Sequence, residues 1–366
     1  MKRLRILAIL SLILVGCGVK NPARTLPAPN KEYFPGMVST NPVIEPVAGD
    51  FKVITVGGGP VPGSVDGIAV NARFNRPEGV ALAPDGSLYV ADTGNYLIRK
   101  VAPSGQVTTV AGSTLGSEDG KGAAARFMGP TDLAVEPNGD LLVADFNRIR
   151  RVSPDGTVAT MALKDSLGNP VKYVEVFGVL YPGDGQIYVS TLHRIDRISP
   201  SGLVTTLAGG TQAGYADGKG IAAYFNLPRK MALLGEKIVV ADFGNLRLRE
   251  VTMQGVVTTR TIAGTGDLGY VDGPSGSALM NFPIGVAADQ EGTLYVADTY
   301  NQAIREVSPD GRIRTLAGNN TYGYQDGNGI QANFAQPSDV EVSQNGTWIY
   351  VADTGNNAIR LIKKEQ

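Results

Sequence analysis

The chain has 366 residues, of which 43% are hydrophobic and 18% are charged, and its formal net charge is −1. This composition is too apolar for a disordered chain, and it lacks the basic excess that binding to nucleic acid requires. The 47 glycines and 22 prolines instead predict many turns, and therefore many short strands.

The first residues of the chain resemble a bacterial lipoprotein signal. A basic start is followed by an apolar run over 6–15 that is too short to span a bilayer. Cys17, the only cysteine, then follows Leu14-Val15-Gly16. This pattern is similar to the lipobox, whose cysteine becomes the lipidated first residue. We expect a signal peptide over 1–16 and acylation of Cys17, palmitate included; the alternative is a secretory signal with a chance cysteine.

Cleavage at this point changes the charge and predicts a location. The loss of three basic residues takes the formal net charge from −1 to −4, which again argues against nucleic acid as a partner. Gly18 follows the cysteine, and resemblance to enterobacterial sorting then favours the outer membrane. Residues 17–50 are rich in proline and have no periodicity, so we expect a semi-rigid tether that holds a domain off the membrane.

One pattern repeats over residues 51–366. An apolar strand ends in a turn such as Pro84-Asp85-Gly86, a second strand ends in Val-Ala-Asp, a third contains Ile-Arg, and a fourth ends in Ala-Gly. Four strands in each repeat of this length predict the blades of a β-propeller. The end of the second strand recurs at Asp92, Asp145, Ser190, Asp242, Asp298 and Asp353.

The two ends of this region predict the number of blades. The sixth repeat stops after its third strand, at 358–362, whereas 52–58 matches the fourth-strand pattern of 107–112. We therefore predict an all-β fold, a six-bladed β-propeller of four-stranded antiparallel blades. The N-terminal strand is expected to complete the last blade, which removes two free edges.

The motif Ala-Asp-Thr-Gly-Asn-x-x-Ile-Arg, at 91–99 and again at 352–360, resembles the NHL repeat. The resemblance implies a six-bladed propeller. It implies no single function, because the family includes protein-binding, RNA-binding and lyase members, so function must be argued from a site.

The side chains that recur in every repeat are predicted to be structural. Asp92 and its equivalents should bind the turn that follows, and arginines such as Arg99 should pair with carboxylates across the hairpin. The long connections between blades share Asp-Gly-x-Gly-x-x-Ala-x-Phe, whose phenylalanine should pack between blades. No βαβ context supports a nucleotide site there. This box lies at 119–127, 217–225 and 326–334, and more loosely at 66–74 and 272–282.

Departures from the repeat indicate a binding surface. Strand order places the blade connections and the second-to-third turns on one face, which we call the top face. Blade three lacks the Asp-Gly box, and its turn over 190–195 is as short as that over 145–150 in blade two. We expect a groove over these two blades. Candidate binding residues are Phe146, Tyr173, Glu175, Phe177, His193, Arg229 and Lys230.

The start of each inner strand should lie at the mouth of the central channel. Asp132 and Asp339, with Glu78, are candidate ligands for a hard cation such as Ca²⁺. Arg229 and Lys230 could bind a carboxylate, and their charge would weaken cation binding. The alternative is a solvated channel of mixed charge. No other cofactor is predicted.

Two classes of function compete. The single histidine, His193, cannot supply the zinc site that resemblance to an amidating lyase would require, and no Gly-x-Ser-x-Gly motif is present. No catalytic residue is predicted. We favour a lipid-anchored cell-envelope scaffold, non-catalytic, that binds a protein or glycan through the top face. The alternative is a lactonase- or lyase-type enzyme with a divalent cation in the channel.

Overall fold

The computed structural model describes residues 43–47, 51–254 and 258–364. Cys17, the signal-like segment and the tether as far as residue 42 lie outside the described residues. Residues 36–366 form one unit, to which all described residues belong. In the part of the chain that the structure describes, no helix is long and apolar enough to cross a membrane.

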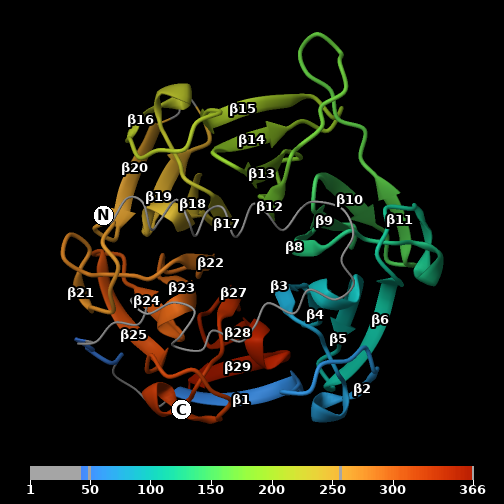
Figure 1. Ribbon diagram of the computed structural model, residues 1–366. Coiled ribbons are helices and arrows are strands. Elements are labelled where there is room, and N and C mark those ends of the chain that lie inside the picture. Colours follow the sequence, from blue (N-terminus) through green and yellow to red (C-terminus); the bar gives the residue numbers. More distant parts are fainter. Residues whose placement is uncertain (1–42, 48–50, 255–257, 365–366) are drawn as a thin grey trace, which may run out of the picture. The chain divides into compact units, whose positions relative to one another are not determined.

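Six antiparallel sheets form the blades, which are arranged in a ring around a central axis (Figure 1). The first strand of each blade lies innermost. These strands are β3 (Pro77–Leu82), β8 (Pro130–Val135), β12 (Val176–Leu180), β17 (Pro228–Leu234), β22 (Pro283–Ala288) and β27 (Pro337–Val342). The second strands are β4 (Leu88–Asp92), β9 (Leu141–Asp145), β13 (Ile187–Thr191), β18 (Lys237–Asp242), β23 (Leu294–Asp298) and β28 (Trp348–Asp353).

Two further strands complete each blade outward. The third strands are β5 (Leu97–Val101), β10 (Arg148–Val152), β14 (Arg194–Ile198), β19 (Arg247–Thr252), β24 (Ala303–Val307) and β29 (Ala358–Lys364). The fourth strands are β6 (Gln106–Gly112), β11 (Thr157–Thr160), β15 (Val204–Gly209), β20 (Thr258–Ala263), β25 (Arg312–Gly318) and β1 (Phe51–Gly58).

The N-terminal strand closes the ring, as the repeat pattern predicted. β1 pairs antiparallel with β29, and Val53 lies opposite Ile362. Blade six therefore combines the first and the last strands of the described chain (Figure 1). Because both edges are paired, neither end of the ring is left as a free sheet edge.

The four predicted strands are present in every blade, and five of the six blades add a fifth. The Asp-Gly-x-Gly box forms this short outer strand, and in four of the five blades, all except blade five, a 3-10 helix follows it. Blade three lacks the box and has neither. The outer strands are β2 (Gly67–Ile68), β7 (Gly120–Lys121), β16 (Gly218–Lys219), β21 (Gly273–Pro274) and β26 (Gly327–Asn328). The helices are η2 (Ala69–Asn71), η4 (Gly122–Ala124), η5 (Gly220–Ala222) and η8 (Gly329–Gln331).

The hydrophobic core consists of six clusters, and each lies between two neighbouring blades. The phenylalanine that ends the connecting box is fully buried in four of them, at Phe74, Phe127, Phe225 and Phe334. In blade five, Met280 fills this position and Phe282 lies two residues beyond it. The prediction that Phe282 is the box phenylalanine was therefore wrong, because its ring does not occupy this interblade position.

The repeated aspartate and arginine form a buried clasp in five blades, as predicted. Arg99 donates from Nη1 to Asp92 at 2.9 Å and from Nη2 to Asp66 at 2.6 Å. Asp92 also accepts a bond from Asn95 in the following turn, and the guanidinium lies 5.1 Å from the Phe74 ring centroid. The equivalent pairs are Asp145–Arg150, Asp242–Arg249, Asp298–Arg305 and Asp353–Arg360. In four blades the turn is a 3-10 helix: η3 (Thr93–Asn95), η6 (Phe243–Asn245), η7 (Thr299–Asn301) and η9 (Thr354–Asn356).

Residues 43–47 lie against the outside of blade five, and we call them the strap. Val43 forms a parallel bridge with Val271, and the N–H of Val47 donates to the carbonyl of Thr315 at 3.0 Å. Glu45 pairs with Arg312, and its N–H donates to Asp272. The Asp272 side chain is fully buried here, whereas its equivalents in the other blades are 42% to 51% exposed. The strap thus covers the carboxylate of Asp272, whereas the equivalent carboxylates of four other blades are partly exposed.

Candidate functional site

The third residue of each inner strand alternates between glycine and a charged residue around the channel. In order they are Gly79, Asp132, Gly178, Lys230, Gly285 and Asp339. A Cβ at Gly79 would lie 2.8 Å from the Thr131 carbonyl oxygen and 3.2 Å from Nζ of Lys230. The glycines therefore leave room for the charged side chains of other blades. We call this ring of six residues the neck.

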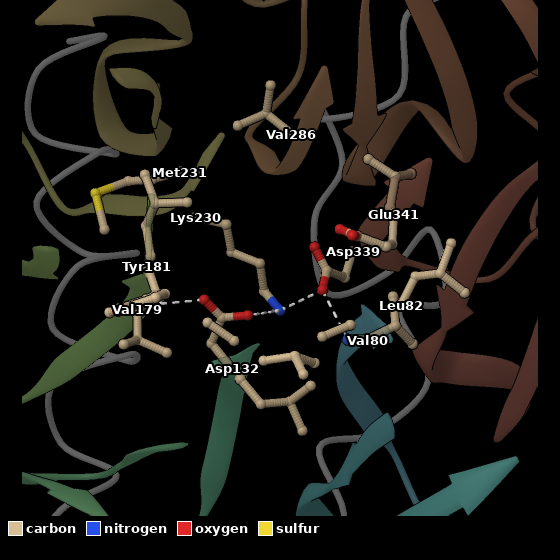
Figure 2. A pocket seen from close by; sticks show the side chains of 16 residues that line it. Val80, Leu82, Asp132, Val179, Tyr181, Lys230, Met231, Val286, Asp339 and Glu341 are labelled. Atoms are coloured by element: carbon tan, nitrogen blue, oxygen red, sulfur yellow. Dashed lines mark hydrogen bonds and ion pairs between the residues drawn. The ribbon is translucent and has the colours of Figure 1, made fainter. Parts of the chain in front are cut away.

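Lys230 lies at the centre of the neck, between two carboxylates from blades two and six (Figure 2). Its Nζ is 2.8 Å from Oδ2 of Asp339 and 3.1 Å from Oδ1 of Asp132. It also donates to the carbonyl oxygens of Glu78 and Thr131, at 2.7 and 3.1 Å. The structure therefore brings together the two candidate cation ligands, and the lysine ammonium occupies the position between them.

Backbone groups complete the neck. The N–H of Val80 donates to Asp339, and that of Val179 donates to Asp132, both at 2.8 Å. Burial raises the pKa of Asp339 to about 7, against the opposing charge of Lys230. Burial lowers the pKa of Lys230, but the two carboxylates outweigh it and raise that pKa overall. The Glu78 side chain points to Arg76, at 3.5 Å. Over 43–47, 51–254 and 258–364, no three His, Cys, Asp or Glu side chains are placed to hold a metal ion.

Above the neck, on the top face, two rings pack against one guanidinium, and two further rings extend the aromatic cluster. Arg229 lies over Phe177, 3.9 Å from Cζ to the ring centroid, and over Phe243 at 4.9 Å. The Phe243 and Phe282 centroids are 4.8 Å apart, and those of Phe282 and Tyr300 are 5.4 Å apart. We call Phe177, Arg229, Phe243, Phe282 and Tyr300 the mouth cluster. It combines two residues that the sequence singled out with three that it did not.

Carboxylates lie near the mouth cluster without neutralising it directly. Burial lowers the pKa of Arg229, and the charges of Glu175 and Glu78 oppose that effect. Burial also raises the pKa of Glu175. Within the described ranges, no ion pair joins Arg229 to either glutamate, and its Nε is buried without a hydrogen-bond partner. The rings thus fix a guanidinium whose hydrogen-bonding capacity is not used up by the protein.

Tyr173 belongs to the core and not to the top face. It is 5% exposed, packs between blades two and three, and occupies the position of the box phenylalanine in other blades. Burial and the nearby charge of Asp196 raise its pKa. Asp196 itself stands where the other blades have the clasp arginine, and Arg194 donates to both of its oxygens at 2.9 Å. In blade three a carboxylate therefore replaces the clasp arginine, and its ion pair with Arg194 lies within one strand.

Phe146 and His193 are both half-buried, in the second-to-third turns of blades two and three. The carbonyl of Phe146 accepts the N–H of Val176, which links the two blades. Burial lowers the pKa of His193, and its Nδ1 is buried without a partner. Among the residues that the structure describes, no hydrogen bond, ion pair or ring contact joins either side chain to the mouth cluster. The groove over blades two and three remains a prediction.

A cavity of about 190 Å³ lies on the other side of the neck, between the later halves of the inner strands (Figure 2). Its walls are mostly Val, Leu, Ala and Met, with Tyr181 and Glu341 as polar additions to the neck residues. Burial raises the pKa of Glu341 to about 8, helped by the charges of Asp339 and Asp132. Sequence reasoning missed Glu341, although comparison of the repeats reveals it. The equivalent residues are Ala81, Ala134, Leu180, Ala232 and Ala287.

Family models match three parts of the chain. The NHL repeat matches residues 74–101 and 280–306, and the teneurin NHL domain matches residues 104–193. NHL repeat-containing protein 2 of Bos taurus is 29% identical over 95% of this chain and 49% of its own length. The SUPPRESSOR OF QUENCHING 1 protein of Arabidopsis thaliana is 28% identical over 85% of this chain and 27% of its own length. The chain spans about half the length of the first of these relatives, 49%.

Solved structures share the fold. An auxiliary nutrient binding protein from Bacteroides ovatus superposes with a TM-score of 0.68 at 17% identity, over 87% of this chain and 78% of that one. A gluconolactonase from Xanthomonas campestris has a TM-score of 0.61 at 14% identity, over 95% of this chain and 100% of that one. At such identities the likeness shows the fold alone. The repeat matches and the six blades together support a propeller of the NHL repeat family.

Proposed function

We propose that this NHL-type propeller is a non-catalytic binding protein of the bacterial cell envelope, lipid-anchored through Cys17. Its site is the mouth cluster on the top face, and its ligand is a protein or glycan, with a glycan favoured. The observation that carries the proposal is the Arg229 guanidinium, held by rings beside Glu175 and Glu78 without an ion pair to either.

The chemistry of the mouth explains why a glycan is favoured. Phe177 and Phe243 hold the guanidinium in place, and Phe282 packs against Phe243. All three rings are almost fully buried, so recognition is left to the polar groups. Arg229 offers donors in a fixed plane, and Glu175 offers acceptors. Sugar hydroxyls both donate and accept hydrogen bonds, so a glycan can use both side chains at once. Two proteins of similar structure, auxiliary nutrient binding proteins of Bacteroides, also fit a binding role.

The enzyme alternative also has a specific observation behind it. A gluconolactonase and a streptogramin B lyase share the fold, at TM-scores of 0.61 and 0.54. A site of that type would use Asp132 and Asp339 with a divalent cation, which would have to displace the Lys230 ammonium. Ca²⁺ should then raise the melting temperature of the protein by linkage. A melting temperature that does not respond to Ca²⁺ favours the binding role.

The proposal is tested with the full-length protein in detergent on an array of bacterial and host glycans. Arg229→Met keeps an unbranched side chain against the rings but removes the donors. We expect its affinity for the bound glycan to fall at least about tenfold, which corresponds to about 1.4 kcal/mol. Glu175→Gln should weaken binding less, because an amide still accepts one hydrogen bond.

The matched control is Arg314→Met, because Arg314 lies on the outer strand β25, away from the mouth. It should bind as the wild type does. Equal binding by Arg229→Met and the wild type would contradict the proposal. If the protein binds an envelope protein and no glycan, the ligand is a protein, and the mouth cluster remains the proposed site.

A further inference from the structure

The cavity below the neck is separate from the mouth cluster and has its own chemistry. Its volume is about 190 Å³, larger than the roughly 150 Å³ of an engineered cavity that binds benzene. Leu82, Val179 and Met231 lie along its walls, and Figure 2 shows Glu341 close to Asp339 at its polar end. It therefore has room for a molecule of six to eight non-hydrogen atoms, about the size of benzene or slightly more.

The charges around this cavity do not balance. Three carboxyl groups, those of Asp132, Asp339 and Glu341, share one cation, Lys230. The two aspartates use that ammonium and a backbone N–H each. Glu341 accepts a hydrogen bond from the N–H of Leu82, and in the described part of the chain no Lys, Arg or His pairs with it. A buried carboxyl group without a cation is costly when ionised, and a bound cation would relieve that cost.

We propose that this cavity binds a small organic cation, a primary ammonium on a short aliphatic chain, whose charged end pairs with Glu341. The aliphatic part would lie against Leu82, Val179 and Met231. Apart from the neck residues, the polar side chains of the lining are those of Glu341 and Tyr181, and backbone groups supply the rest of its polar surface. Ca²⁺ needs six to eight oxygen ligands, so this lining suits an ammonium with an apolar body better than a bare metal ion. The inference does not depend on the function proposed for the mouth.

The experiment compares n-pentylamine with 1-pentanol, a neutral molecule of nearly the same shape, by calorimetric titration of the full-length protein at pH 8. Pentylamine should bind at least about tenfold more tightly than pentanol, because only the ammonium forms a charge-assisted bond. Glu341→Gln should remove that tenfold advantage and leave the binding of pentanol unchanged. Glu236→Gln, a change at an exposed turn, is the matched control and should behave as the wild type.

The wild-type titration decides the question even if Glu341→Gln folds poorly. Equal binding of pentylamine and pentanol, or binding of neither, would overturn the proposal. Retained pentylamine binding in Glu341→Gln would also overturn it, as would competition by Ca²⁺ at equal concentration. Arg229→Met should leave pentylamine binding intact, so failure of the mouth site and failure of the cavity site can be told apart.

Discussion

At the scale of single residues, the neck shows how much depends on one buried cation. Lys230 satisfies two carboxylates that come from blades far apart in the sequence. Removing one partner of a buried ion pair leaves an uncompensated charge, which typically costs about 3–5 kcal/mol. The stability of the ring should therefore be sensitive to this side chain although it lies at the centre of the channel and outside the interblade core.

Lys230→Met should lower the free energy of unfolding by about 3–5 kcal/mol at pH 8, and by less at pH 5. The pKa of Asp339 is already raised to about 7 by burial, and loss of the lysine raises it further. A carboxyl group whose pKa is raised in the folded state stabilises while protonated, and that stability is lost as the pH rises through the folded value. Urea unfolding at both pH values measures the difference.

The control carries Lys230→Met together with Asp132→Asn and Asp339→Asn. It should regain most of the stability lost at pH 8, because no charged side chain remains in the neck. If Lys230→Met is equally destabilised at pH 5 and pH 8, the carboxylates are not the cause.

The sequence predicted those residues that recur, and it failed where a residue is unique. Asp92 and Arg99 repeat in most blades, so their pairing could be inferred within one hairpin. The contact of Lys230 with Asp132 and Asp339 crosses the channel, and no local pattern encodes it. Tyr173 was placed on the top face because blade three lacks the box, yet its ring fills the ordinary core position. Phe282 was mistaken for the box phenylalanine, whose position is occupied by Met280.

At the scale of elements, the strap is a part that the repeat did not predict. It adds parallel bridges outside blade five, where Asp272 accepts the N–H of Glu45 and donates its own N–H to Val43. The ion pair of Glu45 with Arg312 is partly exposed and should add at most about 1 kcal/mol. Most of the attachment therefore comes from backbone hydrogen bonds.

Deleting residues 43–47 should lower the free energy of unfolding by about 1–3 kcal/mol, because a few backbone hydrogen bonds are lost. The amide of Asp272 should then exchange its hydrogen faster, as its acceptor on Val43 is gone. Hydrogen exchange followed by mass spectrometry measures this, with Asp217 in blade four as the internal control. Unchanged protection at Asp272 would mean that the strap does not stay docked in solution.

At the scale of the whole molecule, stability depends on closure. Each of the six core clusters lies between neighbouring blades, so every blade supports two others. β1 brings Phe51 and Val53 into the cluster between blades five and six, and it pairs with β29 along its whole length. The repeat pattern predicted the six blades, and the incomplete sixth repeat predicted their closure by the N-terminal strand, but neither predicted the fifth strands or the strap.

Deleting residues 51–58 should replace the single unfolding transition with a broad one at lower denaturant concentration, and should promote aggregation through the exposed edge of β29. Denaturation followed by circular dichroism, with light scattering, measures both. The deletion of 43–47 is the matched control, because it removes chain at the same end and leaves the ring closed. A sharp transition without residues 51–58 would show that closure is dispensable.

The order of the strap and β1 along the chain has a mechanical consequence. A pulling force applied from the N-terminal side reaches residues 43–47 before it reaches the closing strand. The strap must therefore detach from blade five before any load falls on the seam between β1 and β29. Under such a force the strap detaches first, and the pairing of β1 with β29 keeps the ring closed.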